Sequence, residues 1–182
     1  PDIDEYRRQL AELQETGDVS GQGEVLSTLA GCYADCGRWN EALSCYCESL
    51  EQFRQSGEIY NTGQVLFNAA LVYKDMGDLK RAQSLLEEAA DIFQSLGALP
   101  CIASATLSLA VISARRGRSQ EAMDLFSQSI GMMEGLGALP DLCEGYIAFA
   151  LFNIQEGKSL QSRFYLSRAE TLISRTDYQP LK

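Results

Sequence analysis

Cysteines are the residues of this 182-residue chain that are best suited to chemistry, and the chain has six of them. Thiolates in a close group can hold zinc, and four cysteines cluster between positions 32 and 47: Cys32, Cys36, Cys45 and Cys47. Their spacing matches no common zinc pattern, and the chain has no histidine to complete one. We therefore expect no metal and no cofactor, and we expect free thiols in a reducing, cytoplasmic compartment.

Catalytic groups of other kinds are also scarce. Without histidine, acid–base catalysis near neutral pH would need a strongly shifted carboxylate, lysine or cysteine. The chain has no phosphate-binding glycine loop and no nucleophile elbow. The sequence therefore predicts that the protein is not an enzyme.

The charge is uneven along the chain. Residues 1–100 contain 17 acidic and 7 basic side chains, a balance of −10, and residues 101–182 contain 8 of each. This balance argues against nucleic-acid binding, which needs clustered Lys and Arg. No apolar run reaches the ~18 residues that a membrane helix needs, so we expect no membrane insertion. The acidic half is either a solvated surface or a field that steers a basic partner.

Two columns of small residues repeat every 40 positions. They are Gly37, Gly77, Gly117 and Gly157, and seven positions earlier Ala30, Ala70, Ala110 and Ala150. Such a period indicates one structural repeat present four times. Apolar spacings of three and four predict two helices in each repeat and no strand. The expected helices lie near 3–15, 23–36, 39–55, 62–76, 79–95, 102–116, 119–135, 141–156 and 159–175.

The same alignment predicts helix ends and cysteine environments. Gly77 should adopt the left-handed conformation after one helix, and Asp78 should cap the next. Ser119 and Ser159 are expected to cap later helices. Cys32 and Cys45 fall in apolar columns and should be core residues, whereas Cys36 and Cys47 fall in mixed columns and should lie near the surface.

The repeat resembles the tetratricopeptide repeat (TPR). The residues that match the family pattern in the second repeat are Leu66, Ala69, Ala70, Tyr73, Ala82, Leu86 and Ala89. Six extra residues per repeat make the chain similar to kinesin light chains and LGN-like adaptors. The resemblance implies an all-α fold, a right-handed superhelical solenoid of antiparallel helix pairs. We expect one domain over 1–182, with a half repeat 1–19 and repeats 20–59, 60–99, 100–139 and 140–180, as part of a longer protein.

The resemblance also implies a concave groove that binds a peptide or amphipathic helix of another protein. Its expected anchors are Phe67, Asn68, Leu71, Leu107, Val111, Ile147 and Leu151. Acidic residues are expected to select the register of the partner and to disfavour acidic partners: Glu24, Asp35, Asp75 and Glu144. No ligand-facing position carries the Lys or Arg of a carboxylate clamp. The apolar anchors could instead pack between neighbouring helices, since Leu and Ile at helical spacing usually form a core.

Two other functions stay open at this point. The unpaired first helix and the uncapped last helix could support self-association, through Leu166, Leu172 and Ile173. Alternatively, the repeats could be a regulatory segment that positions another domain of a larger protein.

Overall fold

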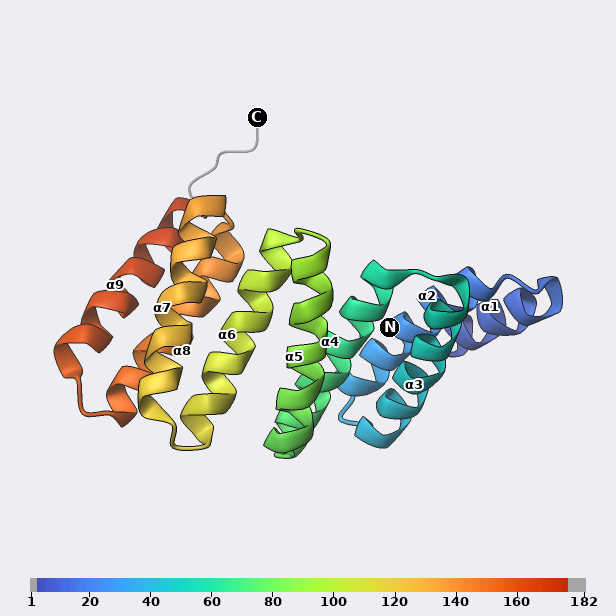
Figure 1. Ribbon diagram of the computed structural model, residues 1–182, viewed down its shortest axis with the longest axis horizontal. Helices are drawn as coiled ribbons and strands as arrows, with labels where there is room; N and C mark the ends of the chain where they lie inside the picture. Colours follow the sequence, from blue (N-terminus) through green and yellow to red (C-terminus); the bar gives the residue numbers. More distant parts are fainter. Residues whose placement is uncertain (1–2, 177–182) are drawn as a thin grey trace. The chain divides into compact units, whose positions relative to one another are not determined.

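The computed structural model describes residues 3–176, and within this range it contains nine helices and no strand (Figure 1). The chain divides into two compact units, an N-terminal unit Pro1–Gly97 and a C-terminal unit Ala98–Lys182. The N-terminal unit contains α1 (Ile3–Thr16), α2 (Val19–Asp35), α3 (Trp39–Ser56), α4 (Ile59–Met76) and α5 (Leu79–Ser95). The C-terminal unit contains α6 (Leu99–Arg115), α7 (Ser119–Leu136), α8 (Leu139–Gln155) and α9 (Ser159–Thr176).

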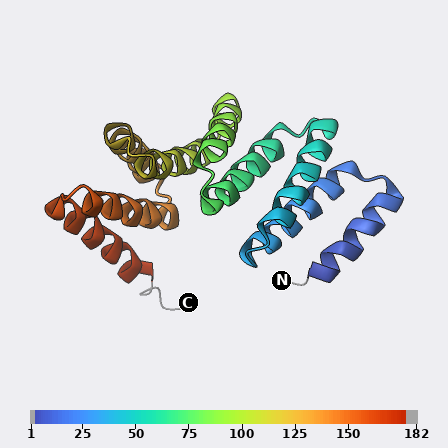
Figure 2. The same ribbon diagram turned by 90° about the horizontal axis from the view of Figure 1, so that it is seen from below.

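Each helix of the N-terminal unit packs against the next, and α2 also contacts α4. Successive helices run in opposite directions (Figure 2). The core of this unit is built from the apolar columns of α2, α3 and α4: Leu29, Ala30, Tyr33, Ala42, Tyr46, Phe53, Val65, Ala69 and Val72. The all-helical expectation for this part of the chain is confirmed.

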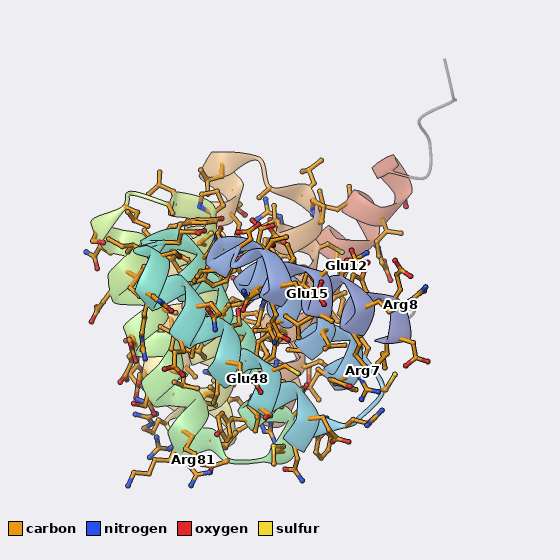
Figure 3. The ribbon with its side chains drawn as sticks, turned by 90° about the vertical axis from the view of Figure 1, so that its right-hand side faces the viewer. Arg7, Arg8, Glu12, Glu15, Glu48 and Arg81 are labelled. Carbon is orange, nitrogen blue, oxygen red and sulfur yellow. The ribbon has the colours of Figure 1, made fainter. Side chains whose placement is uncertain are left out.

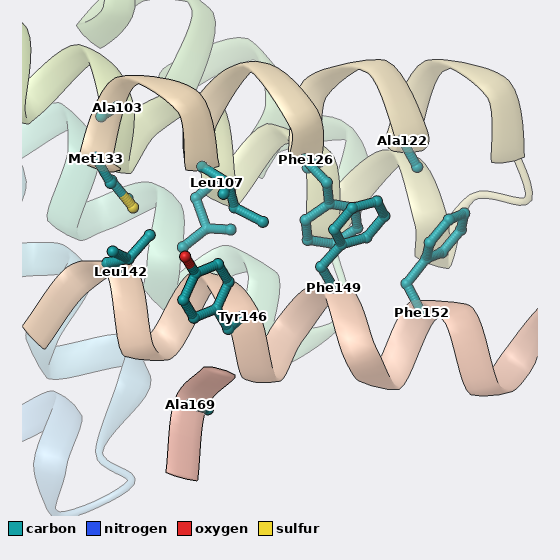
Figure 4. Close-up of a cluster of buried hydrophobic side chains, with 12 residues drawn as sticks. Ala103, Leu107, Ala122, Phe126, Met133, Leu142, Tyr146, Phe149, Phe152 and Ala169 are labelled. Carbon is teal, nitrogen blue, oxygen red and sulfur yellow. The ribbon is translucent and has the colours of Figure 1, made fainter. Parts of the chain in front are cut away.

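The C-terminal unit follows the same plan, with contacts between successive helices and between α6 and α8. Its core is rich in aromatic rings (Figure 4). Phe126 of α7 stacks on Phe149 of α8 with ring centroids 4.9 Å apart, and Phe152 lies 5.4 Å from Phe126. Whether the two units act as one domain stays a prediction.

Helix ends follow the repeat. Gly77 has φ 86° after α4, a conformation that glycine adopts at little cost. The Asp78 side chain accepts a hydrogen bond from the backbone N–H of Arg81 at 3.1 Å, which caps α5 as expected. Asp18 caps α2 in the same way, through the backbone N–H of Gly21 at 3.0 Å.

Other helix starts correct the sequence analysis. The first helices of the repeats begin two to four residues earlier than expected, at Val19, Ile59, Leu99 and Leu139. The expected bounds 102–116 and 141–156 leave out Pro100 and Pro140, but each proline lies in the first turn of its helix. The backbone N–H that proline lacks would have no acceptor within the helix at that position. The capping role of Ser119 was also wrong. Arg118 occupies the cap position, and the Ser119 hydroxyl donates to Glu156 Oε1 at 2.8 Å.

The cysteine environments agree with the repeat alignment except at Cys45, which was expected in the core but packs against its edge. Cys32 is buried and Cys45 is half-buried, whereas Cys36 and Cys47 are exposed. Burial raises the pKa of the Cys45 thiol. Within residues 3–176, which include all six cysteines, the structure has no disulfide bond.

Close contact within each helix pair depends on a small residue opposite a large one. A Cβ atom at Gly23 of α2 would lie 2.8 Å from the Phe53 ring of α3. One repeat later, a Cβ atom at Gly63 would lie 2.9 Å from the Phe93 ring. In the C-terminal unit the equivalent positions hold Ala103 and Met133. Where the first helix has alanine in place of glycine, the second helix therefore has the flexible side chain of methionine in place of a rigid phenylalanine ring.

Candidate functional site

A pocket of about 310 Å³ lies in the N-terminal unit between α2 and α4. Its lining is mainly polar: Glu24, Ser27 and Thr28 of α2, Phe53 of α3, and Asn61, Gln64 and Val65 of α4. The pocket lies where the first helices of two successive repeats meet, which is the surface that the resemblance predicts for a ligand.

On α4 the pocket continues into a row of side chains along one face. Gln64, Asn68, Leu71 and Asp75 are spaced by four, three and four residues, so they point to the same side of the helix. The first three are half-buried and Asp75 is exposed. Phe67 is also half-buried, but it lies one position before Asn68 and therefore faces about 100° away from it.

On α2 the matching row is Glu24, Thr28, Gly31 and Asp35. Both carboxylates are exposed, and the Thr28 hydroxyl donates to the Glu24 carbonyl at 3.0 Å. We name the surface formed by the two rows the α2–α4 face: Glu24, Ser27, Thr28, Gly31 and Asp35 of α2, with Asn61, Gln64, Asn68, Leu71 and Asp75 of α4. None of its residues is Lys or Arg.

A hydrogen-bonded group holds one end of the α2–α4 face. Asn61 donates through its side-chain amide to the carboxylate of Glu58, and the Ser56 hydroxyl donates to the same carboxylate at 3.1 Å. Hydrogen bonds from Ser20, and then from Asn61 and Ser56, lower the pKa of Glu58, although partial desolvation opposes them. Glu58 therefore joins the start of α2 to the start of α4 as an ionised carboxylate.

The side of the N-terminal unit that Figure 3 shows carries both signs of charge, with Glu12, Glu15 and Glu48 together with Arg7, Arg8 and Arg81. The excess of acidic side chains is a property of the unit's composition. Residues 1–97 contain 17 acidic and 7 basic side chains, and residues 98–182 contain 8 of each. A positively charged partner would therefore be attracted to the N-terminal unit more than to the C-terminal unit.

Predicted anchors in the C-terminal unit occupy two kinds of place. Leu107 is only 6 % exposed and belongs to the core, and Val111 packs against that core. Ile147 and Leu151 of α8 are 39 % and 55 % exposed, and Glu144 is exposed beside them. Leu107 therefore offers little surface to a partner, whereas the α8 residues offer a great deal.

The sequence analysis missed a second pocket, of about 500 Å³, in the C-terminal unit. Its polar wall is a group of three side chains from α7, α8 and α9. Glu134 accepts hydrogen bonds from the Tyr146 hydroxyl at 2.6 Å and from Arg168 at 3.0 Å. Burial, and then Glu134, raise the pKa of Tyr146 to about 12. Glu134 and Arg168 are two repeats from Arg54 and Glu88, and this charge pattern could have revealed the pair in the sequence.

Metal-ligand clusters and membrane-spanning helices are absent from the part of the chain that the structure describes. Within residues 3–176, no three His, Cys, Asp or Glu side chains lie close enough together to hold a metal ion. Among the helices that the structure describes, none has the length and apolar character needed to cross a bilayer.

Comparison with known proteins decides the family. The family model described as tetratricopeptide repeat matches residues 22–95 and, in a second overlapping match, residues 65–135. The chain belongs to the tetratricopeptide-repeat family. The matched region includes the α2–α4 face. A separate search of curated protein sequences gave no match.

Solved structures resemble this TPR protein over nearly its whole length. BtubC (BKLC) from P. vanneervenii has a TM-score of 0.81 at 21 % identity, over 97 % of this chain and 74 % of that chain. The TPR-like repeats described for a kinesin light chain of Podosopora anserina have a TM-score of 0.75 at 17 % identity, over 97 % and 87 %. The Rap conjugation gene regulator of the plasmid pLS20, in complex with the Phr* peptide, has a TM-score of 0.76 at 13 % identity. That match covers 87 % of this chain and 44 % of the regulator. At identities this low, the structural similarity shows the fold alone. That fold is an all-α TPR-like solenoid.

Proposed function

We propose that this TPR protein is a non-enzymatic scaffold that binds a segment of another protein on its α2–α4 face. The observation that carries the proposal is the polar pocket between the first helices of two successive repeats. The side chains beside it are arranged for recognition, because two carboxamides and two hydroxyls surround the space without a nucleophile and base in contact with one another. The partner is a peptide, either extended or helical.

The chemistry of the α2–α4 face indicates what such a peptide would contain. The side-chain amides of Gln64 and Asn68 have donors and acceptors that can bond the backbone of an extended peptide. Leu71 adds an apolar contact one turn further along α4. No residue of the face is Lys or Arg, and Lys74 beside it lies 3.8 Å from the Asp75 carboxylate, so an acidic tail or a C-terminal carboxylate would have to compete with Asp75 for that ammonium group.

Charge adds a preference for basic peptides. Glu24, Asp35 and Asp75 are exposed along the face, and the N-terminal unit as a whole has an excess of acidic side chains. Opposite charges of this kind accelerate encounter and disfavour acidic competitors, with a modest contribution to affinity itself. The effect on affinity should therefore decrease as the salt concentration rises.

The neighbouring structures support peptide binding as a use of this fold. The Rap regulator of the plasmid pLS20 was solved in complex with the Phr* peptide, and another Rap protein in complex with competence and sporulation factor. The first of these complexes is an example of a protein with a similar fold that holds a peptide. The α2–α4 face is the place on this chain where we expect the equivalent contact.

Peptide selection with a random display library, followed by calorimetry on the enriched peptides, tests the proposal. We expect basic, carboxylate-poor peptides to be enriched, and Asn68→Ala or Leu71→Ala to weaken their binding about fivefold or more, in line with loss of a buried polar or apolar contact. The matched control is Ser108→Ala, at the position equivalent to Asn68 in the C-terminal unit. Equal affinity in Asn68→Ala, Leu71→Ala and the unsubstituted chain would contradict this site, provided that circular dichroism shows intact folds.

A further inference from the structure

The pocket of about 500 Å³ in the C-terminal unit is lined by the end of α7, the start of α8 and the second half of α9. We call it the α7–α9 pocket, and its main walls are the polar group of Glu134, Tyr146 and Arg168 and the apolar side chains of Leu139, Leu142 and Leu172. A mostly apolar lining with a few polar groups, in a space of about 300–1,000 Å³, is typical of ligand sites.

A repeat that followed α9 would cover a different part of this helix. The preceding second helix, α7, is covered by α8 at Phe126, Ile130 and Met133, which are 1 %, 6 % and 1 % exposed. Forty positions later, the same columns of α9 hold residues that do not line the pocket: Leu166, Glu170 and Ile173.

The α9 residues that do line the pocket stand in columns that a following repeat leaves accessible. They are Arg168, Thr171 and Leu172. On α7 the same columns are exposed or half-buried although α8 and α9 follow, at Gln128, Gly131 and Met132. The α7–α9 pocket is therefore a property of the third and fourth repeats themselves.

Two aromatic rings hold the arginine of the pocket in place. The Arg168 guanidinium lies 5.2 Å from the centre of the Tyr146 ring and 5.4 Å from that of Phe164. In the earlier repeats both columns are aliphatic or polar: Leu26, Leu66 and Thr106, and Ser44, Ser84 and Asp124. A side chain that is already held loses little further freedom when a ligand binds.

The hydrogen bonds of the polar wall leave a donor and an acceptor beside one another. Tyr146 and Arg168 both donate to Oε1 of Glu134, and the Tyr146 hydroxyl points towards α7 (Figure 4). Among the residues that the structure describes, none donates to Oε2 of Glu134, and Arg168 donates only through Nη1. The side chains of Arg168 and Glu134 are 47 % and 40 % exposed, so a ligand can reach both.

We propose that the α7–α9 pocket binds an uncharged peptide segment that has an apolar side chain. The N–H and C=O of a peptide group complement Glu134 Oε2 and the Arg168 guanidinium. The charges of Glu134 and Arg168 cancel, so the wall has no net attraction for a free carboxylate or a free ammonium group. The apolar side chain would cover Leu139, which is 43 % exposed. Such a segment differs from the basic peptide proposed for the α2–α4 face.

The probe is N-acetyl-leucyl-leucine amide, which has no charge at either end. NMR titration of the full chain should give a dissociation constant of about 0.1–1 mM, as expected for a small ligand in an open pocket. Two analogues, one with a free carboxylate and one with a free ammonium group, should each bind about threefold more weakly, the scale of partly exposed charge effects.

Substitution of either charge should reverse this preference. Glu134→Gln leaves the charge of Arg168 uncompensated, so the carboxylate analogue should bind better than the uncharged probe. Arg168→Gln should favour the ammonium analogue for the same reason. Arg163→Gln is the matched control, because Arg163 is an exposed arginine of α9 outside the pocket, and it should leave the order of the three probes unchanged.

A bulky residue tests the position of the probe. Thr171 is exposed at the pocket, so Thr171→Trp should prevent binding, whereas Glu170→Trp should allow it. Three results would overturn the proposal: no binding of the uncharged probe, the same order of probes in both charge variants as in the unsubstituted chain, or loss of binding in Asn68→Ala, which would assign the probe to the α2–α4 face. Circular dichroism checks that each variant is folded.

Discussion

The two units make equivalent contacts from different residues. In the N-terminal unit Gly23 of α2 faces the Phe53 ring, and in the C-terminal unit, two repeats later, Ala103 and Met133 take the same positions. Glycine is thus replaced by alanine, which adds a methyl group, and the phenylalanine ring is replaced by the flexible thioether of methionine. What the repeat preserves is therefore the combined volume of the contact rather than either residue.

The ion pairs between successive second helices differ more sharply. Arg54 of α3 lies 3.2 Å from Glu88 of α5, and two repeats later Glu134 of α7 lies 3.0 Å from Arg168 of α9. The positions are equivalent and the charges are reversed. Each unit thus has an attractive pair at these two positions. If the first position kept Arg54 and the second held an arginine like Arg168, the pair would be repulsive. The comparison indicates that the charge on the second helix of one repeat is matched to the charge on the second helix of the next repeat.

The largest expected effect comes from breaking the volume match. Gly23→Ala would place a Cβ atom 2.8 Å from the Phe53 ring, so overpacking should lower the free energy of unfolding by about 2–3 kcal/mol, as measured by urea denaturation. Gly145→Ala is the control, because its nearest neighbours, Ile130 and Met133, lie 3.5 Å away. That change should cost nothing and could add about 0.5–1 kcal/mol, since alanine favours a helix.

A double variant sharpens the same comparison. Adding Phe53→Met to Gly23→Ala gives the N-terminal unit the pair found in the C-terminal unit, and most of the lost stability should return. If the double variant unfolds as easily as the sum of the two single variants predicts, the volumes are not matched as a pair.

A medium effect is expected from two buried serines that join paired helices. Ser49 donates to the Gly23 carbonyl at 2.7 Å, and Ser129 donates to the Ala103 carbonyl at 2.8 Å. Ser49→Ala and Ser129→Ala should each lower the free energy of unfolding by about 1 kcal/mol in urea denaturation. Alanine fits at these positions, because Ala89 occupies the equivalent place at 0 % exposure. A loss in one unit alone would show that the units use this contact differently.

The fold could be predicted almost completely from the sequence, because it follows from columns that recur. The period, the helix pairs and the glycine at each helix end are properties of spacing, and Gly77 and Asp78 behave as predicted. Errors fell at helix starts. There a proline can lie either before the first turn or inside it, and Pro100 lies inside.

The candidate site was less predictable, because exposure depends on what covers a helix. Leu107 and Ile147 stand in the same column, yet one is 6 % exposed and the other 39 %. The pocket between α2 and α4 and the group around Glu134 both require residues from different repeats to meet at particular rotamers. The opposite charges of Glu134 and Arg168 can be recognised in the repeat columns, but the rotamers that form the two pockets cannot. The binding role of the predicted anchors therefore stays a prediction.

A smaller effect is expected at acidic pH, where only the N-terminal unit has the relevant group. Hydrogen bonds lower the pKa of Glu58 from its ordinary value of 4.5, and the equivalent residue two repeats later is Ala138. The ionised carboxylate therefore stabilises the fold above pH 4.5, and this contribution disappears as the pH falls through the lowered pKa.

Glu58→Ala tests this contribution by giving the N-terminal unit the residue of the C-terminal unit. Urea midpoints should be lower in the variant than in the unsubstituted chain near neutral pH. The two should converge as the pH falls below the lowered pKa. A difference that persists unchanged into strong acid would mean that Glu58 acts through packing instead of charge.

The smallest effect is expected from the reversed ion pairs, which are largely exposed. Double-mutant cycles on Arg54 and Glu88 should give a coupling of about 0.2–1 kcal/mol that nearly vanishes in 1 M salt. The cycle on Glu134 and Arg168 should give more and retain part of it in salt. The reason is that Arg168 also lies over the rings of Tyr146 and Phe164, at 5.2 and 5.4 Å, and such contacts depend less on ionic strength. Equal couplings with equal salt dependence would mean that the aromatic rings add nothing, and that charge reversal is the whole difference between the two pairs.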